Sequence, residues 1–309
     1  MLKDFISLHD INHFDFHEIL KQAADIKRHP SRYRAKLKNR VLAMIFQKPS
    51  LRTRMTFEVG ILQMGGHAIY LSPGDGQVGV RESFYDVGKN LERWVDGIMI
   101  RTFAHKNCLD LAEAASIPVI NGLSDLSHPC QAMADFLTIK EYKRTLNGLK
   151  LTWVGDGNNV CHSLMLAAAR AGMTMAVATP PGYEPDPQMV KWAIDDGAGT
   201  GFGLQLTHDP RQAVSEADAV YTDVWASMGQ ESEKEERARV FSSFRVDKEL
   251  MASARPDSLF MHCLPAHRGE EVTDEVIDSP NSVVFDQAEN RLHVQKAIML
   301  SLMEKHEKK

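Results

Sequence analysis

The sequence predicts an α/β fold with two doubly wound parallel-sheet domains, and two observations indicate this. Short apolar stretches of strand length alternate with segments of helical periodicity along most of the 309 residues, as in parallel sheets covered by helices on both faces. A chain of this length also exceeds the usual size of one hydrophobic core. Polar and charged side chains follow several of the expected strands, which is where open sheets bind ligands. We therefore expect an active-site cleft between the two domains.

In the first half of the chain, each expected strand is an apolar run of about five residues bounded by turn-forming or polar residues. These strands are expected at residues 40–46, 67–71, 97–100 and 118–121. Helices are expected from Ser50 onward and at residues 82–95, 109–115 and 129–142. The segment 82–95 shows the reason most clearly, because Phe84, Val87, Leu91 and Trp94 recur at helical spacing.

A second α/β series follows a break near residues 143–149. Strands are expected at residues 150–154, 174–178, 203–206, 219–222, 259–262 and 282–285, and helices at 161–171 and 287–305. The charge-rich segment 231–239 is interpreted as a solvated helix face, in preference to a mobile loop. The expected domains are residues 1–145 and 146–290, with a C-terminal helix at 291–309 that packs back on the first domain.

Composition excludes several classes of protein. The net charge of −5 argues against a general nucleic-acid binder. No apolar run approaches the roughly 18 residues of a membrane span, and the first residues lack the apolar core of a secretory signal. Four scattered cysteines without a Cys-x-x-Cys pair make a disulfide framework or a zinc site improbable, and they favour a reducing cytoplasm.

The strongest chemical signal is the run Ser50-Leu51-Arg52-Thr53-Arg54. A serine that caps a helix, followed by arginines at the positive end of the helix dipole, makes a phosphate-binding site. Taken alone, the motif is equally consistent with a solvated basic helix start.

Other candidates also follow expected strands or begin helices. Arg101 directly follows an apolar strand, where a guanidinium needs an anion or oxygen partners. His128 and Gln131 begin a helix and can donate to a carbonyl oxygen and accept from an amide, although a capped helix start with a buried thiol explains them as well. Arg291 can reach a phosphate or can be a surface arginine.

The second half offers a possible nucleotide motif and an acceptor site. Residues 155–159 read Gly-Asp-Gly-Asn-Asn, but Val160 stands where a dinucleotide fingerprint needs its third glycine. Asn159 can instead bind a carboxylate or amine. Asp223, followed by Ser227 and Gly229, suits a zwitterionic amino acid, or else forms an Asx-type turn.

His262 and Cys263 end the strand expected at residues 259–262. Because neighbouring side chains of a strand face opposite ways, we do not expect these two residues to bind one metal ion.

Together these motifs resemble the aspartate/ornithine carbamoyltransferase family, and within it the branch that uses ornithine, over essentially the whole chain. The segments that carry the resemblance run from Phe46–Arg54 to Ala288-Glu289-Asn290-Arg291, and the stretch Ser227-Met228-Gly229 decides between acceptors. Leu51 departs from the family, in which threonine is common at this position. Its backbone N–H is kept, so phosphate binding should persist with one hydroxyl contact fewer.

The resemblance implies the following site residues. Carbamoyl phosphate is bound by Ser50, Leu51, Arg52, Thr53, Gln77, Arg101, His128, Gln131, Cys263, Leu264 and Arg291. Ornithine is bound by Asn159, Asp223, Ser227 and Met228, and the catalytic residues are Arg101, His128, Asp223 and Cys263. It also implies a homotrimer, with Gln77 near a subunit boundary.

The implied reaction transfers the carbamoyl group of carbamoyl phosphate to the side-chain amine of L-ornithine, with no metal and no organic cofactor. A role in arginine biosynthesis is expected, although one site serves biosynthesis and breakdown alike. The alternatives are a carbamoyltransferase for putrescine or an acylated ornithine, a nucleotide-dependent oxidoreductase suggested only by residues 155–159, and a non-enzymatic binding protein.

Overall fold

The computed structural model describes residues 2–75, 78–226 and 233–304. The chain divides into two compact units, Met1–Leu137 with Glu289–Lys309 and Thr138–Ala288. The divisions fall inside two helices, whereas the sequence placed the domain boundaries at residues 145/146 and 290/291. Among the described residues, no helix is long and apolar enough to cross a membrane.

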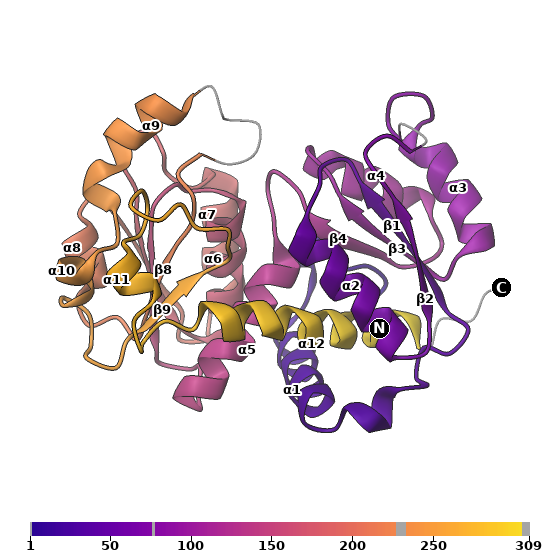
Figure 1. The fold of residues 1–309 in the computed structure, drawn as a ribbon, viewed down its shortest axis with the longest axis horizontal. Helices are drawn as coiled ribbons and strands as arrows, with labels where there is room; N and C mark the ends of the chain where they lie inside the picture. Colours follow the sequence, from indigo (N-terminus) through magenta and orange to yellow (C-terminus); the bar gives the residue numbers. More distant parts are fainter. Residues whose placement is uncertain (1, 76–77, 227–232, 305–309) are drawn as a thin grey trace. The chain divides into compact units, whose positions relative to one another are not determined.

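The first unit is built on a four-stranded parallel sheet (Figure 1). Its strands are β1 (Val41–Phe46), β2 (His67–Leu71), β3 (Gly97–Arg101) and β4 (Val119–Leu123), in the order β2-β1-β3-β4. Its helices are α1 (His13–Arg28), α2 (Leu51–Gln63), α3 (Phe84–Trp94), α4 (His105–Ala114) and the first part of α5 (Pro129–Lys143), with short 3₁₀ turns η1 (Leu8–Asp10) and η2 (Pro30–Tyr33).

Helix α3 shows how the sequence builds this unit. Ser83 caps the helix by accepting a hydrogen bond from the backbone N–H of Asp86. Phe84, Val87 and Leu91 then lie on one face, are buried, and pack with apolar residues of β1, β3 and α4. The helix therefore covers part of one face of the sheet.

The second unit is built on a five-stranded parallel sheet. Its strands are β5 (Lys150–Val154), β6 (Thr174–Ala178), β7 (Gly203–Thr207), β8 (Ala219–Thr222) and β9 (Leu259–His262), in the order β7-β6-β5-β8-β9. Its helices are α6 (Asn159–Ala171), α7 (Pro187–Asp196), α8 (Pro210–Val214), α9 (Lys234–Val240), α10 (Lys248–Met251) and α11 (Asp274–Ile277), with η4 (Phe241–Phe244) and the start of α12 (Val284–Met303).

Strand order places the candidate residues at the ligand-binding edge of each sheet. The order in which the chain adds strands reverses between β1 and β3 in the first sheet, and between β5 and β8 in the second, while all strands stay parallel. Ser50 follows β1 and Arg101 ends β3, while residues 155–159 follow β5 and Asp223 follows β8. Ligands of open α/β sheets bind at such switch points, so each unit offers one half-site.

The predicted class, with two parallel-sheet domains, is confirmed, but the strand expected at residues 282–285 is wrong. Only an isolated bridge joins Ser282 to Phe260, and α12 already begins at Val284. A short apolar run cannot distinguish a strand from the first turn of a buried helix.

The described part of the charge-rich segment is only partly the solvated helix face that its charges predict. Glu235 and Glu236 are exposed, as expected for a solvated face, but Arg237 on the same helix is buried. Its guanidinium contacts the Asp156 carboxylate at 2.9 Å and donates to the Trp225 carbonyl oxygen at 2.8 Å. Burial raises the pKa of Asp156, while Arg237 opposes that shift. Charge patterning alone cannot show such long-range ion pairs.

Candidate active site

The first half-site begins at the N-terminus of α2. The Ser50 side chain accepts a hydrogen bond from the backbone N–H of Thr53 at 3.3 Å, as a helix cap should. Leu51 and Arg52 form the first turn, where backbone N–H groups have no helical partner and the dipole attracts anions. This end of the helix is therefore suited to a phosphate group.

Two arginines from distant parts of the chain meet on the Thr53 hydroxyl. It accepts from Arg101 Nη1 at 3.3 Å and from Arg291 Nη2 at 2.8 Å. Thr53 is fully buried, and both arginines are more than nine-tenths buried. Buried guanidiniums retain their charge, so this arrangement concentrates positive charge beside the capped helix.

His128 lies next to this cluster and is held in its neutral form. Burial lowers its pKa well below the usual value, and Arg291, Arg101 and Lys48 lower it further. A neutral imidazole still carries one N–H and can donate it to a carbonyl oxygen.

Gln131 and Asp135 lie one turn apart on α5. Gln131 Nε2 donates to Asp135 Oδ1 at 2.8 Å, and both side chains are buried. The other end of the amide, Gln131 Oε1, accepts no hydrogen bond from the residues that the structure describes.

Lys48 is a candidate that the sequence reasoning missed. Its side chain is buried, and its ammonium lies 4.8 Å from the centre of the Phe103 ring. Burial and then the charge of Arg101 lower its pKa to about 8. Its position in the sequence, between a buried strand and the capped N-terminus of α2, could have indicated Lys48, because a lysine there is close enough to bind the same phosphate.

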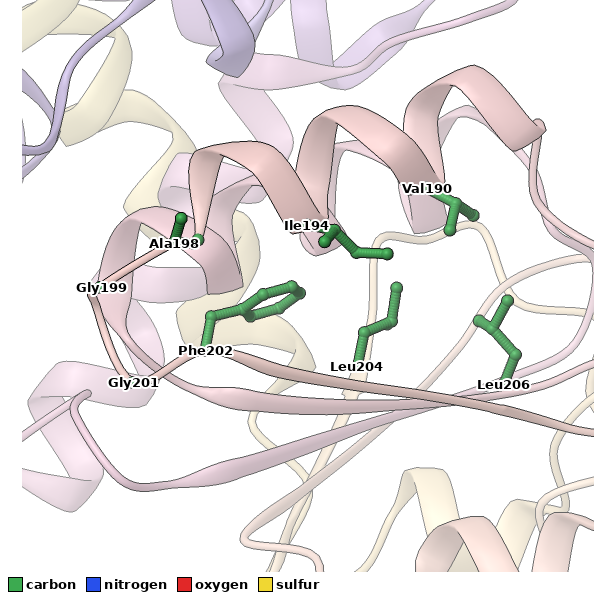
Figure 2. A pocket seen from close by; sticks show the side chains of 9 residues that line it. Val190, Ile194, Ala198, Gly199, Gly201, Phe202, Leu204 and Leu206 are labelled. Atoms are coloured by element: carbon green, nitrogen blue, oxygen red, sulfur yellow. The ribbon is translucent and has the colours of Figure 1, made fainter.

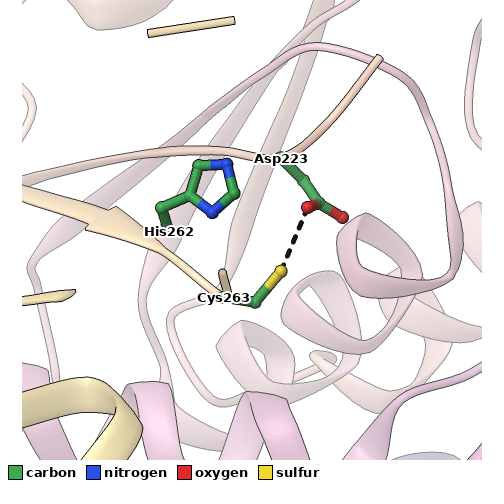
Figure 3. A group of neighbouring side chains, drawn as sticks. All are labelled: Asp223, His262 and Cys263. Atoms are coloured by element: carbon green, nitrogen blue, oxygen red, sulfur yellow. Dashed lines mark hydrogen bonds between the residues drawn. The ribbon is translucent and has the colours of Figure 1, made fainter. Parts of the chain in front are cut away.

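The second half-site gathers around Asp223. Asn158 caps α6 by accepting from the N–H groups of Val160 and Cys161, and its Nδ2 donates to Asp223 Oδ2 at 3.2 Å. Cys263 Sγ donates to Asp223 Oδ1 at 3.1 Å (Figure 3). Asn159 is the first residue of α6. The structure thus brings together the ends of β5, β8 and β9.

His262 and Cys263 lie close together, although neighbouring side chains of a strand face opposite ways; that they do not bind one metal ion stays a prediction. Ligand-type atoms of Asp223, His262 and Cys263 lie within 4.8 Å of one another (Figure 3), because β9 ends at His262 and strand alternation ends with it.

The His262 ring is nevertheless engaged at both nitrogens. Nδ1 accepts from the Leu264 N–H at 2.8 Å, which leaves the proton on Nε2, 3.2 Å from Glu271 Oε1. His262 therefore anchors the Cys263–Leu264 turn.

Three of the predicted site residues, Gln77, Ser227 and Met228, lie outside the described residues. The other twelve fall into two groups, one in each unit. Ser50, Leu51, Arg52, Thr53, Arg101, His128, Gln131 and Arg291 belong to the first unit, and Asn159, Asp223, Cys263 and Leu264 to the second.

An apolar groove in the second unit lies between α7 and the edge strand β7 (Figure 2). Its volume is about 630 Å³, and Ile194, Phe202 and Leu206 are among the residues that line it. Every lining residue is apolar or glycine, so the groove has no side chain for acid, base or nucleophilic chemistry.

Comparison with known families identifies both units. The carbamoyl-P binding domain of aspartate/ornithine carbamoyltransferases matches residues 3–141, and the Asp/Orn binding domain matches residues 147–302. The chain belongs to the aspartate/ornithine carbamoyltransferase family.

Relatives within this family are similar over nearly their full length. The ornithine carbamoyltransferase of Thermococcus kodakarensis is 57% identical over 97% of this chain and 96% of its own. A relative from Pyrococcus furiosus, described as an anabolic ornithine carbamoyltransferase, is 58% identical over 86% of this chain and 84% of its own. The solved structure of the Pyrococcus furiosus ornithine carbamoyltransferase superposes with a TM-score of 0.96 at 53% identity, covering 99% of this chain and 98% of that one.

Proposed function

We infer that this chain transfers the carbamoyl group of carbamoyl phosphate to the side-chain amine of L-ornithine, giving L-citrulline and phosphate. One observation carries the donor side of this reaction: Arg101 and Arg291 converge on Thr53 at the capped end of α2. The acceptor side is supported by full-length similarity to proteins named ornithine carbamoyltransferase.

The first unit binds and activates the donor. Arg52, Arg291 and the N-terminus of α2 neutralise the phosphate, which is the leaving group. Arg101, Thr53 and neutral His128 donate to the carbonyl oxygen, so they stabilise the negative charge that develops on it in the tetrahedral intermediate.

The second unit holds the acceptor. Asp223 and Cys263 position the side-chain amine, while Asn159, Ser227 and Met228 bind the rest of the amino acid, with Leu264 beside the reacting carbon. The amine nitrogen bonds to the carbonyl carbon, the carbon–oxygen bond to phosphate breaks, and the departing phosphate takes up the proton that the amine loses. The cleft expected between the two domains stays a prediction.

No metal or organic cofactor enters this scheme, because the phosphate of the donor is already an activated leaving group. Orientation of two bound ligands can supply roughly 7–11 kcal/mol of the barrier reduction. Deprotonation of an amine with a free pKa of about 10.4 is the chemical requirement that the second half-site must meet.

We also propose a homotrimer in which Gln77 of a neighbouring subunit completes the donor site. Leu51, Met55 and Leu62 form an exposed apolar stripe along α2. Apolar stripes of this kind mark subunit interfaces, and this one begins at the phosphate-binding turn. A cytoplasmic role in arginine biosynthesis is proposed with it, in keeping with the anabolic description of one relative.

A comparison of acceptors tests the function. Purified protein with carbamoyl phosphate is supplied in turn with L-ornithine, putrescine, an acylated ornithine and L-aspartate, and phosphate release is measured. We expect ornithine to give the highest kcat/KM by a wide margin. A preference for another amine would show that the proposed acceptor is wrong. Binding of NAD(P), measured by calorimetry, would support the alternative of a nucleotide-dependent oxidoreductase.

A further inference from the structure

Asp135 is a buried acid that the proposed mechanism does not use. It is fully buried on α5, seven residues after His128 and four after Gln131. Residues at this spacing lie on one face of a helix, so Asp135 lies on the same face as the two side chains assigned to the carbamoyl group. Fully buried carboxylates are rare unless they are paired.

The contact between Asp135 and Gln131 defines the orientation of the Gln131 amide. A carboxylate has only acceptors, so the end of the amide that lies 2.8 Å from Asp135 Oδ1 must be the nitrogen. Gln131 Oε1 is therefore directed away from Asp135. No described residue donates to this buried oxygen, and a buried acceptor that is left unsatisfied destabilises the site.

We propose that Asp135 is a positioning residue that makes the donor site selective for a carbamoyl group. By holding Gln131 Nε2, it fixes Oε1 as an acceptor for the –NH₂ of carbamoyl phosphate. The inference rests on the proposed function, since it assumes that the carbamoyl group lies beside Gln131.

This arrangement distinguishes carbamoyl phosphate from other acyl phosphates, which the phosphate-binding residues cannot do. Acetyl phosphate has the same phosphate and carbonyl oxygen, but a methyl group replaces the –NH₂. Ser50, Arg52 and the N-terminus of α2 treat the two donors alike. A site whose buried acceptor is satisfied only by a donor group on the ligand rejects an analogue that lacks this group. Gln131 therefore discriminates between the two donors, and Asp135 fixes the orientation of Gln131.

A reciprocal exchange of side chains tests the proposal, with binding of carbamoyl phosphate, acetyl phosphate and inorganic phosphate measured by calorimetry. Gln131→Glu sets two carboxylates against each other and should weaken carbamoyl phosphate binding about tenfold or more. In the double variant Gln131→Glu/Asp135→Asn, the new amide at position 135 donates an N–H to one oxygen of the new carboxylate. The other carboxylate oxygen is then free to accept from the ligand. The double variant should therefore regain most of the lost affinity.

The single variant Asp135→Asn provides a second measurement. Its amide can pair with either end of Gln131, so the preference for carbamoyl over acetyl phosphate should fall while inorganic phosphate binds as in the wild type. This ratio decides the matter if Gln131→Glu fails to fold.

Two results would overturn the positioning role: a double variant no better than Gln131→Glu, or an Asp135→Asn variant that loses affinity for all three ligands equally. Failure of the wild type to bind carbamoyl phosphate would instead overturn the proposed function.

Discussion

Thr53 connects the helix that binds phosphate to the two arginines that surround it. Its backbone N–H closes the Ser50 cap, and its hydroxyl accepts from Arg101 and Arg291. One buried residue thus fixes both the start of α2 and the position of two charges. These contacts hold the charged groups in fixed positions, which is what electrostatic stabilisation of a reacting group requires.

Substitution of Arg52 tests the phosphate site directly. Arg52→Ala should weaken carbamoyl phosphate binding roughly tenfold to a hundredfold, because a hydrogen bond to a charged group is worth roughly 1.5–3 kcal/mol. Arg54→Ala is the matched control on the same helix, since Arg54 pairs with Glu58 and stacks on Tyr70. Equal binding losses in the two variants, measured by calorimetry, would refute the assignment.

Lys48 should make donor binding sensitive to pH. Its pKa of about 8 in the ligand-free protein must rise when a phosphate dianion binds beside it, because an opposite charge favours the protonated form. Below pH 8 the ammonium is already present and affinity should be constant. Above pH 8 binding must take up a proton, so affinity should fall by up to about tenfold per pH unit.

Lys48→Arg keeps its charge throughout this range and should bind carbamoyl phosphate equally well from pH 7 to pH 9.5. Lys106→Arg on the surface is the control and should follow the wild type. If the Lys48→Arg variant shows the wild-type slope, another group is titrating.

At the scale of elements, α12 ties the second sheet together at its first turn. Gln287 Oε1 accepts from the His262 backbone N–H at 3.1 Å, and its Nε2 donates to the Tyr221 hydroxyl at 2.9 Å. One side chain therefore joins β8 and β9, the strands that precede Asp223 and Cys263. The position of the second half-site depends on this link.

Gln287→Leu should lower the free energy of unfolding by roughly 2–4 kcal/mol, since two buried polar groups lose their partner. Urea denaturation measures the effect. Gln188→Leu, on the exposed surface of α7, is the control and should change stability by less than about 0.5 kcal/mol. A Gln287→Leu variant as stable as this control would contradict the prediction, because it would show that water or other groups bond to the His262 N–H and the Tyr221 hydroxyl in place of Gln287.

Most strands could be predicted from the sequence, because in a parallel sheet each is a short apolar run between polar loops. Residues 150–154, 174–178 and 219–222 match the observed strands. Residues 282–285 show the limit: Val283 and Val284 are buried as a strand would be, but they lead into a helix. The local pattern of apolar residues shows that a segment is buried. Whether the segment pairs with a strand or begins a helix depends on the rest of the fold.

Only those site residues that belong to a recognisable local motif could be predicted from the sequence. Ser50, Thr53 and Arg101 were indicated because each has a visible reason at a strand end or helix start. Lys48 and Asp135 were missed because their roles depend on burial and on neighbours brought close by folding. The His262–Glu271 contact was missed for the same reason.

At the scale of the whole molecule, a shared active site predicts recovery of activity in mixed assemblies. Gln77→Ala and Arg101→Ala subunits should each be nearly inactive. After subunit exchange, a site that combines Arg101 from one subunit with Gln77 from its neighbour is complete, so activity should return. Mixing Arg101→Ala with His128→Ala is the control, because both residues belong to one subunit and no complete site forms. No gain over this control, with exchange confirmed, would contradict a shared site.

Transfer of an isotopically labelled carbamoyl carbon is the decisive test of carbamoyl transfer to ornithine by this chain. Purified protein is incubated with labelled carbamoyl phosphate and L-ornithine, and the products are followed by NMR. We expect the label to appear in the ureido carbon of L-citrulline, in step with phosphate release, and neither product to accumulate enzymatically without ornithine. Phosphate release without labelled citrulline, or at a rate independent of ornithine, would contradict this expectation.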